Sequence, residues 1–185
     1  MNRSALPLSC LSAALLGLSA CTAPAATETA AVPAAAMPSD ADLLARGEYL
    51  VRIGGCNDCH TPGYPESGGA IPKEQWLVGS ALGWNGPWGT TYPANLRLKA
   101  QEMDEAGWLK YTGELHTRPP MPDFALRGMA EDDRRALYRL IRSLGQAGAK
   151  APDYLPPAQK PNPPYVQWVL PPPPADAAPA APTAG

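Results

Sequence analysis

The chain has 185 residues, of which 24 are proline, and its formal net charge at pH 7 is −2. Alanine-rich ends inflate the hydrophobic fraction of 45%, whereas the single Phe and all five Trp lie between positions 76 and 168. This distribution predicts one small folded core with long non-globular ends. Because basic residues are not in excess, the composition argues against nucleic-acid binding.

Residues 1–20 have the pattern of a signal peptide. Arg3 supplies a basic start, and an apolar run follows at residues 6–18. The run is too short and too close to the terminus for a transmembrane helix. We therefore expect this segment to direct export and then to be removed.

The end of the apolar run resembles a bacterial lipobox. It reads LSAC at residues 18–21, so we expect cleavage before Cys21 and lipidation of that cysteine; an ordinary signal peptide cut nearby is the alternative. Cys10 would leave with the signal. Thr22, rather than Asp, follows Cys21, which resembles outer-membrane sorting. The prediction is a lipid-anchored protein on the bacterial periplasmic side, at the outer membrane.

Composition divides the remainder into three parts. Residues 21–38 are Ala- and Pro-rich and have no apolar period, which predicts a flexible tether. Residues 39–150 are expected to form the folded domain. Residues 151–185 are Pro-rich and are expected to form a strap followed by a disordered tail. The aromatic anchors of the strap are Tyr154, Tyr165 and Trp168.

Local patterns predict about three main helices and an all-α fold. Ser39 and Asp42 have capping-box spacing at the start of a helix over residues 40–53. A short helix is expected over residues 103–111. Leucines and isoleucine at helical spacing, with acids at the start, predict a last helix over residues 131–144.

A long segment over residues 61–101 is rich in Gly, Pro and Trp, which argues against long helices or central strands. A loop of this length inside a compact domain is unusual unless something fills the space beneath it. A large flat cofactor would fill it. The candidate contacts to such a cofactor are Trp88, Tyr92, Asn95 and Arg97.

The motif that carries chemistry is GGCNDCHTPG at residues 54–63. It places Cys56 and Cys59 three residues apart, and His60 follows directly. This CxxCH pattern is the attachment signature of a c-type haem. Each thiol adds to one vinyl group of the porphyrin, and the adjacent histidine supplies an axial nitrogen to the iron. One motif predicts one haem.

Three other interpretations of the motif are weaker. Zinc would need four ligands, and only His116 is left to complete a set with Cys56, Cys59 and His60. A thioredoxin-like dithiol is expected beside a βαβ pattern, which the chain lacks. A structural disulfide between the two cysteines, with a coincidental histidine, is the third.

The second axial ligand is open among several residues. Met121 lies in a loop stiffened by three prolines, which would hold a neutral thioether against iron. His116 is an alternative ligand, and an open position is another. Met103 and Met129 lie near helix starts, where methionine usually fills a core. Met37 lies in the tether.

Three stretches resemble class I monohaem c-type cytochromes, in particular the haem modules of the cytochrome c subunits of alcohol and gluconate dehydrogenases. They are LLARGEYLVRIGGCNDCHTPG, GPWGTTYPANL and PPMPDFALRGMAEDDRRALYRLIRSLG, and the resemblance covers residues 40–148. It implies a small helical fold around haem, with Met121 as distal ligand. It also implies that the first helix crosses the last near Gly47. One departure is Leu140, where the family has an aromatic residue, with Tyr138 two positions earlier.

The expected function is single-electron transfer between redox protein partners, such as a dehydrogenase and a terminal oxidase or reductase. On this interpretation the protein is a carrier rather than an enzyme. One alternative is a cytochrome subunit fixed in a membrane-associated dehydrogenase complex. Another is a haem enzyme or sensor with an open distal site.

Overall fold

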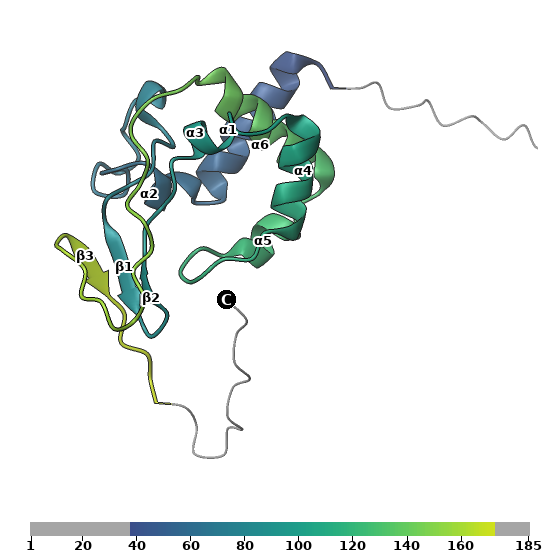
Figure 1. Cartoon of the computed structure of the whole chain (residues 1–185). Helices are drawn as coiled ribbons and strands as arrows, with labels where there is room; N and C mark the ends of the chain where they lie inside the picture. The colour runs from purple at the N-terminus through teal and green to yellow at the C-terminus, as the bar shows by residue number, and fades with distance from the viewer. Residues whose placement is uncertain (1–37, 173–185) are drawn as a thin grey trace, which may run out of the picture. The chain divides into compact units, whose positions relative to one another are not determined.

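The computed structural model describes residues 38–172 (Figure 1). The predicted signal peptide, Cys21, the tether up to residue 37 and the tail from residue 173 lie outside the described residues. The described part contains six α-helices, a short 3₁₀ helix and one three-stranded sheet. Its helices are α1 (Asp40–Ile53), α2 (Cys56–His60), α3 (Leu96–Lys99), α4 (Glu105–Glu114), α5 (Asp123–Arg127) and α6 (Glu131–Ser143), with η1 at Lys73–Gln75. Its strands are β1 (Gly83–Gly86), β2 (Gly89–Thr91) and β3 (Tyr165–Gln167).

Helix α1 begins with the predicted capping box. The Ser39 hydroxyl accepts a hydrogen bond from the Asp42 backbone N–H at 3.2 Å. The Asp42 carboxylate accepts in return from the Ser39 backbone N–H at 3.1 Å. Two N–H groups that the helix leaves unpaired are thereby satisfied. The predicted bounds of this helix are confirmed. None of the helices in the described part is long and apolar enough to cross a membrane.

The core lies where α1 crosses α6, which lie side by side (Figure 1). A Cβ at Gly47 would lie 2.4 Å from the Ala136 carbonyl oxygen and 2.8 Å from Leu140 Cβ. Only glycine therefore permits this approach of the two helices. The expectation that Gly47 marks the crossing is confirmed.

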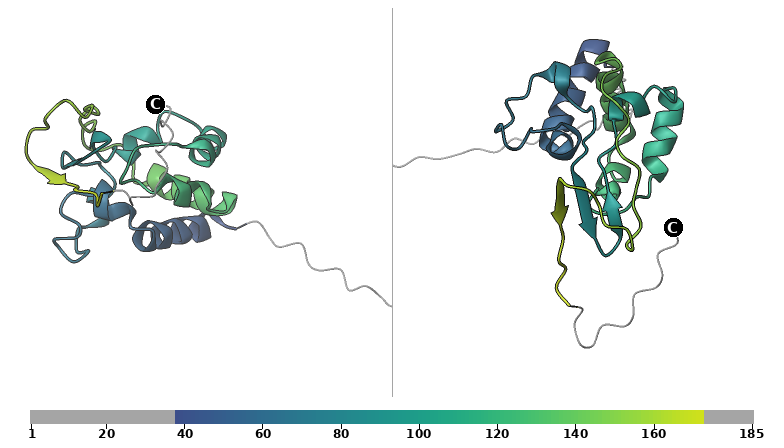
Figure 2. Two further views of the ribbon diagram at one scale, coloured as in Figure 1. Left: turned by 90° about the horizontal axis from the view of Figure 1, so that it is seen from below. Right: turned by 60° about the vertical axis from the view of Figure 1, so that its left-hand side comes forward.

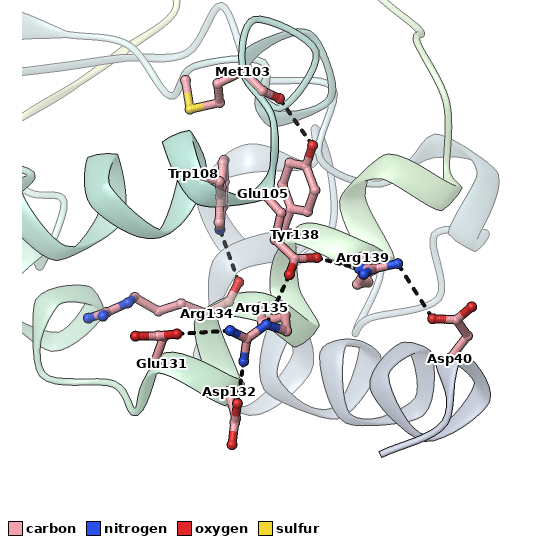
Figure 3. Close-up of polar contacts among 10 residues, drawn as sticks. All are labelled: Asp40, Met103, Glu105, Trp108, Glu131, Asp132, Arg134, Arg135, Tyr138 and Arg139. Atoms are coloured by element: carbon pink, nitrogen blue, oxygen red, sulfur yellow. Dashed lines mark hydrogen bonds and ion pairs between the residues drawn. The ribbon is translucent and has the colours of Figure 1, made fainter. Parts of the chain in front are cut away.

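Helix α4 packs on α6 through aromatic side chains (Figure 3). The rings of Trp108 and Tyr138 lie 5.9 Å apart. The Trp108 indole N–H donates to the Arg134 carbonyl at 3.0 Å, and the Tyr138 hydroxyl donates to the Met103 carbonyl at 3.1 Å. Tyr138 thus supplies an aromatic contact to α4 from another face of α6, while Leu140 faces Gly47.

The expectation of an all-α fold is wrong in one respect, because part of the Gly- and Pro-rich segment forms strands. Strands β1 and β2 pair antiparallel across a two-residue turn, with Gly86 opposite Gly89. Gly89 has φ +95°, and a Cβ there would lie 2.3 Å from the Leu155 carbonyl oxygen. Glycine therefore ends the turn.

The strap completes the sheet. Thr90 forms an isolated antiparallel bridge with Leu155. The chain then returns as β3, which runs parallel to β1, so the strand order is β2-β1-β3 (Figure 2). The strap therefore lies against the outer side of the hairpin, with Trp168 near Trp84 and Trp88.

Candidate haem-binding site

A cavity of about 250 Å³ lies among helices α1, α2, α4 and α6, the hairpin and the loop before α5. The structure brings Cys56, Cys59, His60 and Met121 together in its wall. Apolar side chains make most of the remaining wall. They include Val51, Leu96, Trp108, Leu126, Leu137 and Ile141.

The motif residues are presented by the single turn of α2. Gly55 precedes this helix in the left-handed conformation, with φ +65°. A Cβ at Gly55 would also lie 3.1 Å from the Asp58 carboxylate. Because of this sharp turn, α2 begins only a few residues after α1 ends. Residues i, i+3 and i+4 of a helix share a face, so Cys56, Cys59 and His60 all border the cavity.

The environment of the two thiols disfavours thiolate chemistry. Burial raises the pKa of Cys56 to about 11. Burial, and after it the Asp58 carboxylate, also raise the pKa of Cys59. Redox dithiols and thiolate metal sites depend on lowered thiol pKa values. The two sulfurs are not bonded to each other, and the described residues contain no cluster of three or more His, Cys, Asp or Glu suited to a metal ion.

The orientation of His60 suits an axial ligand. Its ring is buried, and Nδ1 lies 2.7 Å from the Ala94 carbonyl oxygen. A carbonyl only accepts, so Nδ1 carries the proton and Nε2 keeps its lone pair. Such a bond to the second ring nitrogen is typical of metal-binding histidines. Burial, which outweighs the bond to Ala94, lowers the pKa of His60 and keeps the ring neutral.

Two of the four candidate cofactor contacts instead hold the loop behind His60. Asn95 caps α3 and donates to the Ala147 carbonyl at 2.8 Å and the Ala149 carbonyl at 3.1 Å. Arg97 is buried and donates to backbone carbonyls of Glu74, Leu144 and Gly145. Neither lines the cavity. Because their carbonyl partners are far away in the sequence, the local sequence pattern could not predict that Asn95 and Arg97 hold this loop in place.

Of the other two candidate cofactor contacts, one lines the cavity and one does not. Tyr92 lines the cavity. Trp88 does not; its indole N–H donates to the Trp84 carbonyl at 3.3 Å. Trp84 itself lines the cavity, and sequence reasoning missed it. The position of Trp84 in the sequence could have indicated a place in the cavity wall only if the β1–β2 hairpin had been predicted.

Met121 faces the cavity from the distal loop, residues 115–122. Thr91 of β2 donates to the Pro119 carbonyl at 2.8 Å. The Asp123 carboxylate accepts from the Thr117 backbone N–H at 2.6 Å and pairs with Arg127 at 2.9 Å. Arg127 also donates to the Leu115 carbonyl. The loop is thus closed at its base by one acid and one arginine, neither of which the motif indicated.

The rival ligands lie elsewhere in the described structure. His116 is exposed and does not line the cavity, although its neighbours Leu115 and Thr117 do. Met103 and Met129 are partly buried against the core, as expected for core-filling methionines. Met37 lies outside the described residues. One imidazole nitrogen, one thioether and two neighbouring thiols in an apolar wall suit a covalently attached haem, and the set does not suit zinc.

Comparison with known proteins gives distant relatives. The chain is 29% identical over 144 residues to the protein described as alcohol dehydrogenase (quinone), cytochrome c subunit, of Gluconacetobacter polyoxogenes. It is equally similar to the protein of the same description of Komagataeibacter europaeus. The match covers 71% of this chain but only 26% of each relative.

No family model matches the chain, and no solved structure matches it. The similarity to cytochrome c subunits therefore stands beside the cavity geometry. The similarity and the cavity lined by Cys56, Cys59 and His60 are the two observations from which a function can be proposed.

Proposed function

We propose that the protein is a class I monohaem cytochrome c that transfers single electrons on the periplasmic side of the outer membrane. The proposal rests on one cavity whose wall includes Cys56, Cys59, His60 and Met121. In this role the two cysteines would hold one haem covalently, and His60 and Met121 would be the ligands of its iron. The haem iron supplies the one-electron chemistry by cycling between Fe(II) and Fe(III).

The protein's own residues set the conditions for that chemistry. The Ala94 carbonyl fixes the tautomer and orientation of His60. The thioether of Met121 is a neutral ligand that favours the reduced state. The apolar wall formed by Val51, Leu137 and Ile141 keeps water away. A low local polarity disfavours additional positive charge, so it raises the reduction potential.

Anchoring through a lipidated Cys21 is part of the proposal. The tether over residues 21–38 would let the domain move between partners while it stays at the membrane. A radiolabelled fatty acid incorporated by the full chain, but not by a Cys21→Ser variant, tests this anchor. Equal labelling of both proteins contradicts it.

The axial ligands are tested by visible and near-infrared spectra of the full chain made with haem-attachment machinery. We expect c-type bands that stay with the protein after acid–acetone extraction, and a weak near-infrared Met–iron band. Met121→Ala should abolish that band and allow carbon monoxide to bind the reduced protein. The matched control is Met103→Ala, whose side chain packs against the core and should leave the band in place. A band that persists in Met121→Ala contradicts the ligand assignment.

A second candidate function is a fixed subunit of a dehydrogenase complex, since the relatives are named as subunits of a quinone alcohol dehydrogenase. This chain spans only a quarter of their length, so it corresponds to one part of them. Purification of the full chain from membranes separates the two functions. A dehydrogenase subunit recovered in fixed ratio supports the complex, and recovery of the chain alone supports a free carrier.

A further inference from the structure

The strap ends in a run of exposed apolar side chains. Val166, Trp168, Val169 and Leu170 are all large, apolar and exposed, and Val169 is 86% exposed. We call these four residues the strap tip. Apolar residues scattered singly over a surface need no explanation, whereas a contiguous exposed group marks a site of interaction. The strap tip therefore indicates a contact with something outside the domain.

The strap tip is held in place by the sheet. Strand β3 lies at the edge of the sheet, next to β1 (Figures 1 and 2). The Trp168 backbone N–H donates to the Asn85 carbonyl at 2.7 Å. The Trp168 ring packs edge-on against Trp84, with centroids 6.3 Å apart. Val169 and Leu170 are therefore presented from a fixed base.

A partner strand is a poor match for this edge. Strand β3 is only three residues long, and prolines lie on both sides of it, at residues 163, 164, 171 and 172. Proline has no N–H to donate to a neighbouring strand, and short strands with proline nearby protect an edge from further pairing. The surroundings of β3 thus disfavour a partner that adds a strand to the sheet.

The strap tip is also small for a protein interface. A specific interface buries about 800 Å² on each partner and involves about 20–30 residues a side. The strap tip offers four apolar side chains within five residues. A second copy of this chain, or another folded protein, would need a wider surface. A bilayer has no such requirement, because affinity for it simply grows with the apolar area that enters it.

The charge of the segment points the same way. No Lys, Arg, Asp or Glu occurs between Lys160 and Asp176. Insertion at this place would therefore bring no charged side chain of the strap with it, which would be costly in lipid. Tryptophan is enriched at the level of the lipid headgroups. Since the segment has no basic residues to attract anionic lipid, it suits a zwitterionic surface.

We propose that the strap tip is a membrane contact, in which Val169 and Leu170 enter the interface of a bilayer and Trp168 lies at its headgroup level. The inference rests on the membrane location in the proposed function, but not on the haem. A lipid at Cys21 would keep the protein at the membrane, and the strap tip would determine which side of the domain faces it. Because Trp168 packs on Trp84, which lines the cavity, the hairpin side of the cavity would lie nearest the bilayer.

The test is electron paramagnetic resonance of a nitroxide label on the full chain, bound to phosphatidylcholine vesicles. Leu170→Cys provides the labelling site, and Tyr49→Cys, at an exposed apolar residue of α1, is the control. Oxygen concentrates in the bilayer and a nickel chelate stays in water, so their relative effects show which medium surrounds the label. We expect the label at residue 170 to shift toward oxygen, and the label at residue 49 to stay in water. A label at residue 170 that stays in water on vesicle-bound protein overturns the proposal.

Loss of the apolar side chains should remove the contact. With the label moved to Val166→Cys, a chain that also carries Val169→Ser and Leu170→Ser should keep its label in water. The matched control carries Tyr49→Ser and Ile53→Ser, which remove two exposed apolar side chains of α1, and should keep the membrane signal. All four replaced side chains are exposed, so both chains should fold, as circular dichroism would show. Equal signals from the two chains overturn the proposal.

Salt separates an apolar contact from a charged one. The signal at residue 170 should persist in high salt, because the strap tip carries no charge. A signal that salt abolishes, or one that appears only when another protein is added, overturns a lipid contact of this kind.

Failure of the proposed function has a different signature. If Cys21 is lipidated and Cys56 and Cys59 hold haem, the chain without an introduced cysteine takes up no label. Uptake by that chain contradicts those attachments, and the strap tip is then judged on the difference between Leu170→Cys and that chain.

Discussion

The two sides of the cavity are built by different means. On the helical side, α1 and α6 bury apolar side chains against each other around Gly47. On the loop side, side chains donate to or accept from backbone groups, as Thr91 does with Pro119 and Asp123 with Thr117. The helical side should therefore be sensitive to added volume, and the loop side to lost donors and acceptors.

The difference also concerns function. The helical side carries the end of α1, which leads directly into α2 and its CxxCH motif. The loop side carries Met121, the proposed distal ligand. A variant of the helical side should change whether the protein folds. A variant of the loop side should change how the proposed haem is ligated, at a smaller cost in stability.

The largest effect is expected from Gly47→Ala. The added methyl group would meet the Ala136 carbonyl and Leu140 at distances that no real contact shows, so the helices must separate. We expect the free energy of unfolding to fall by about 3 kcal/mol or more. Urea unfolding followed by circular dichroism measures it.

The control makes the same substitution in another helix. Gly113→Ala in α4 places its methyl group 3.6 Å from the nearest atom of Arg134, an ordinary contact. It should be neutral, or stabilise by up to about 1 kcal/mol, because alanine favours helix. A Gly47→Ala protein as stable as Gly113→Ala would mean that the helix crossing is looser than the structure indicates.

A medium effect is expected from Asp123→Ala on the loop side. The change leaves the Thr117 N–H and Arg127 without their acceptor at the base of the distal loop. We expect about 1–2 kcal/mol of lost stability. Under the proposed ligation, we also expect a weakened near-infrared Met–iron band, because the loop that holds Met121 is less constrained.

Asp133→Ala provides the comparison. It also removes an Arg–Asp pair, with Arg46 at 2.8 Å, but this pair joins α1 to α6. It should cost less stability than Asp123→Ala, because the Arg46 side chain is half exposed and solvent weakens the pair. The Met–iron band should stay unchanged. Equal band intensities in Asp123→Ala and Asp133→Ala would show that the acid at residue 123 does not position Met121.

The helical side was the part that the sequence predicted well. Helix α1 follows from a capping box and an apolar stripe within fourteen residues, and α6 from a similar stripe behind three acids. Such signals are local, so a single stretch of chain contains all the information. The motif in α2 is equally local, and its Cys56, Cys59 and His60 all line the cavity.

The loop side could not be predicted in the same way, because its contacts join distant residues. Strand β3 pairs with β1 across about eighty residues, as Tyr165 opposite Gly83 shows. Three residues of strand carry too little pattern to predict such pairing. Arg97 was a reasonable cofactor contact by residue type, yet its partners are carbonyls near the end of α6 and at Glu74. A buried arginine needs acceptors, and the sequence does not say which backbone groups will provide them.

The smallest effect is expected from Glu105→Gln in the ion-pair network of the helical side (Figure 3). Glu105 of α4 accepts from Arg135 at 3.0 Å and from Arg139 at 2.5 Å, and Arg139 reaches Asp40 of α1 at 3.5 Å. Burial alone would raise the pKa of Glu105, but Arg139 and Arg135 together lower it below its ordinary value of 4.5. Loss of the charge should cost about 1 kcal/mol at pH 7 and low salt.

The sign of the pH dependence sharpens this prediction. Because the pKa is lowered in the folded state, the carboxylate contributes stability above pH 4.5, and that contribution is lost as pH falls through the folded pKa. The stability difference between the unmodified protein and Glu105→Gln should therefore shrink below pH 4.5, and also in high salt. Glu102→Gln, which loses only the surface pair with Lys99, should show almost no difference at any pH. If Glu105→Gln and Glu102→Gln have the same stability at every pH, the ion pairs of Glu105 do not stabilise the helical side. That side would then depend on apolar packing alone, unlike the loop side with its hydrogen bonds to backbone groups.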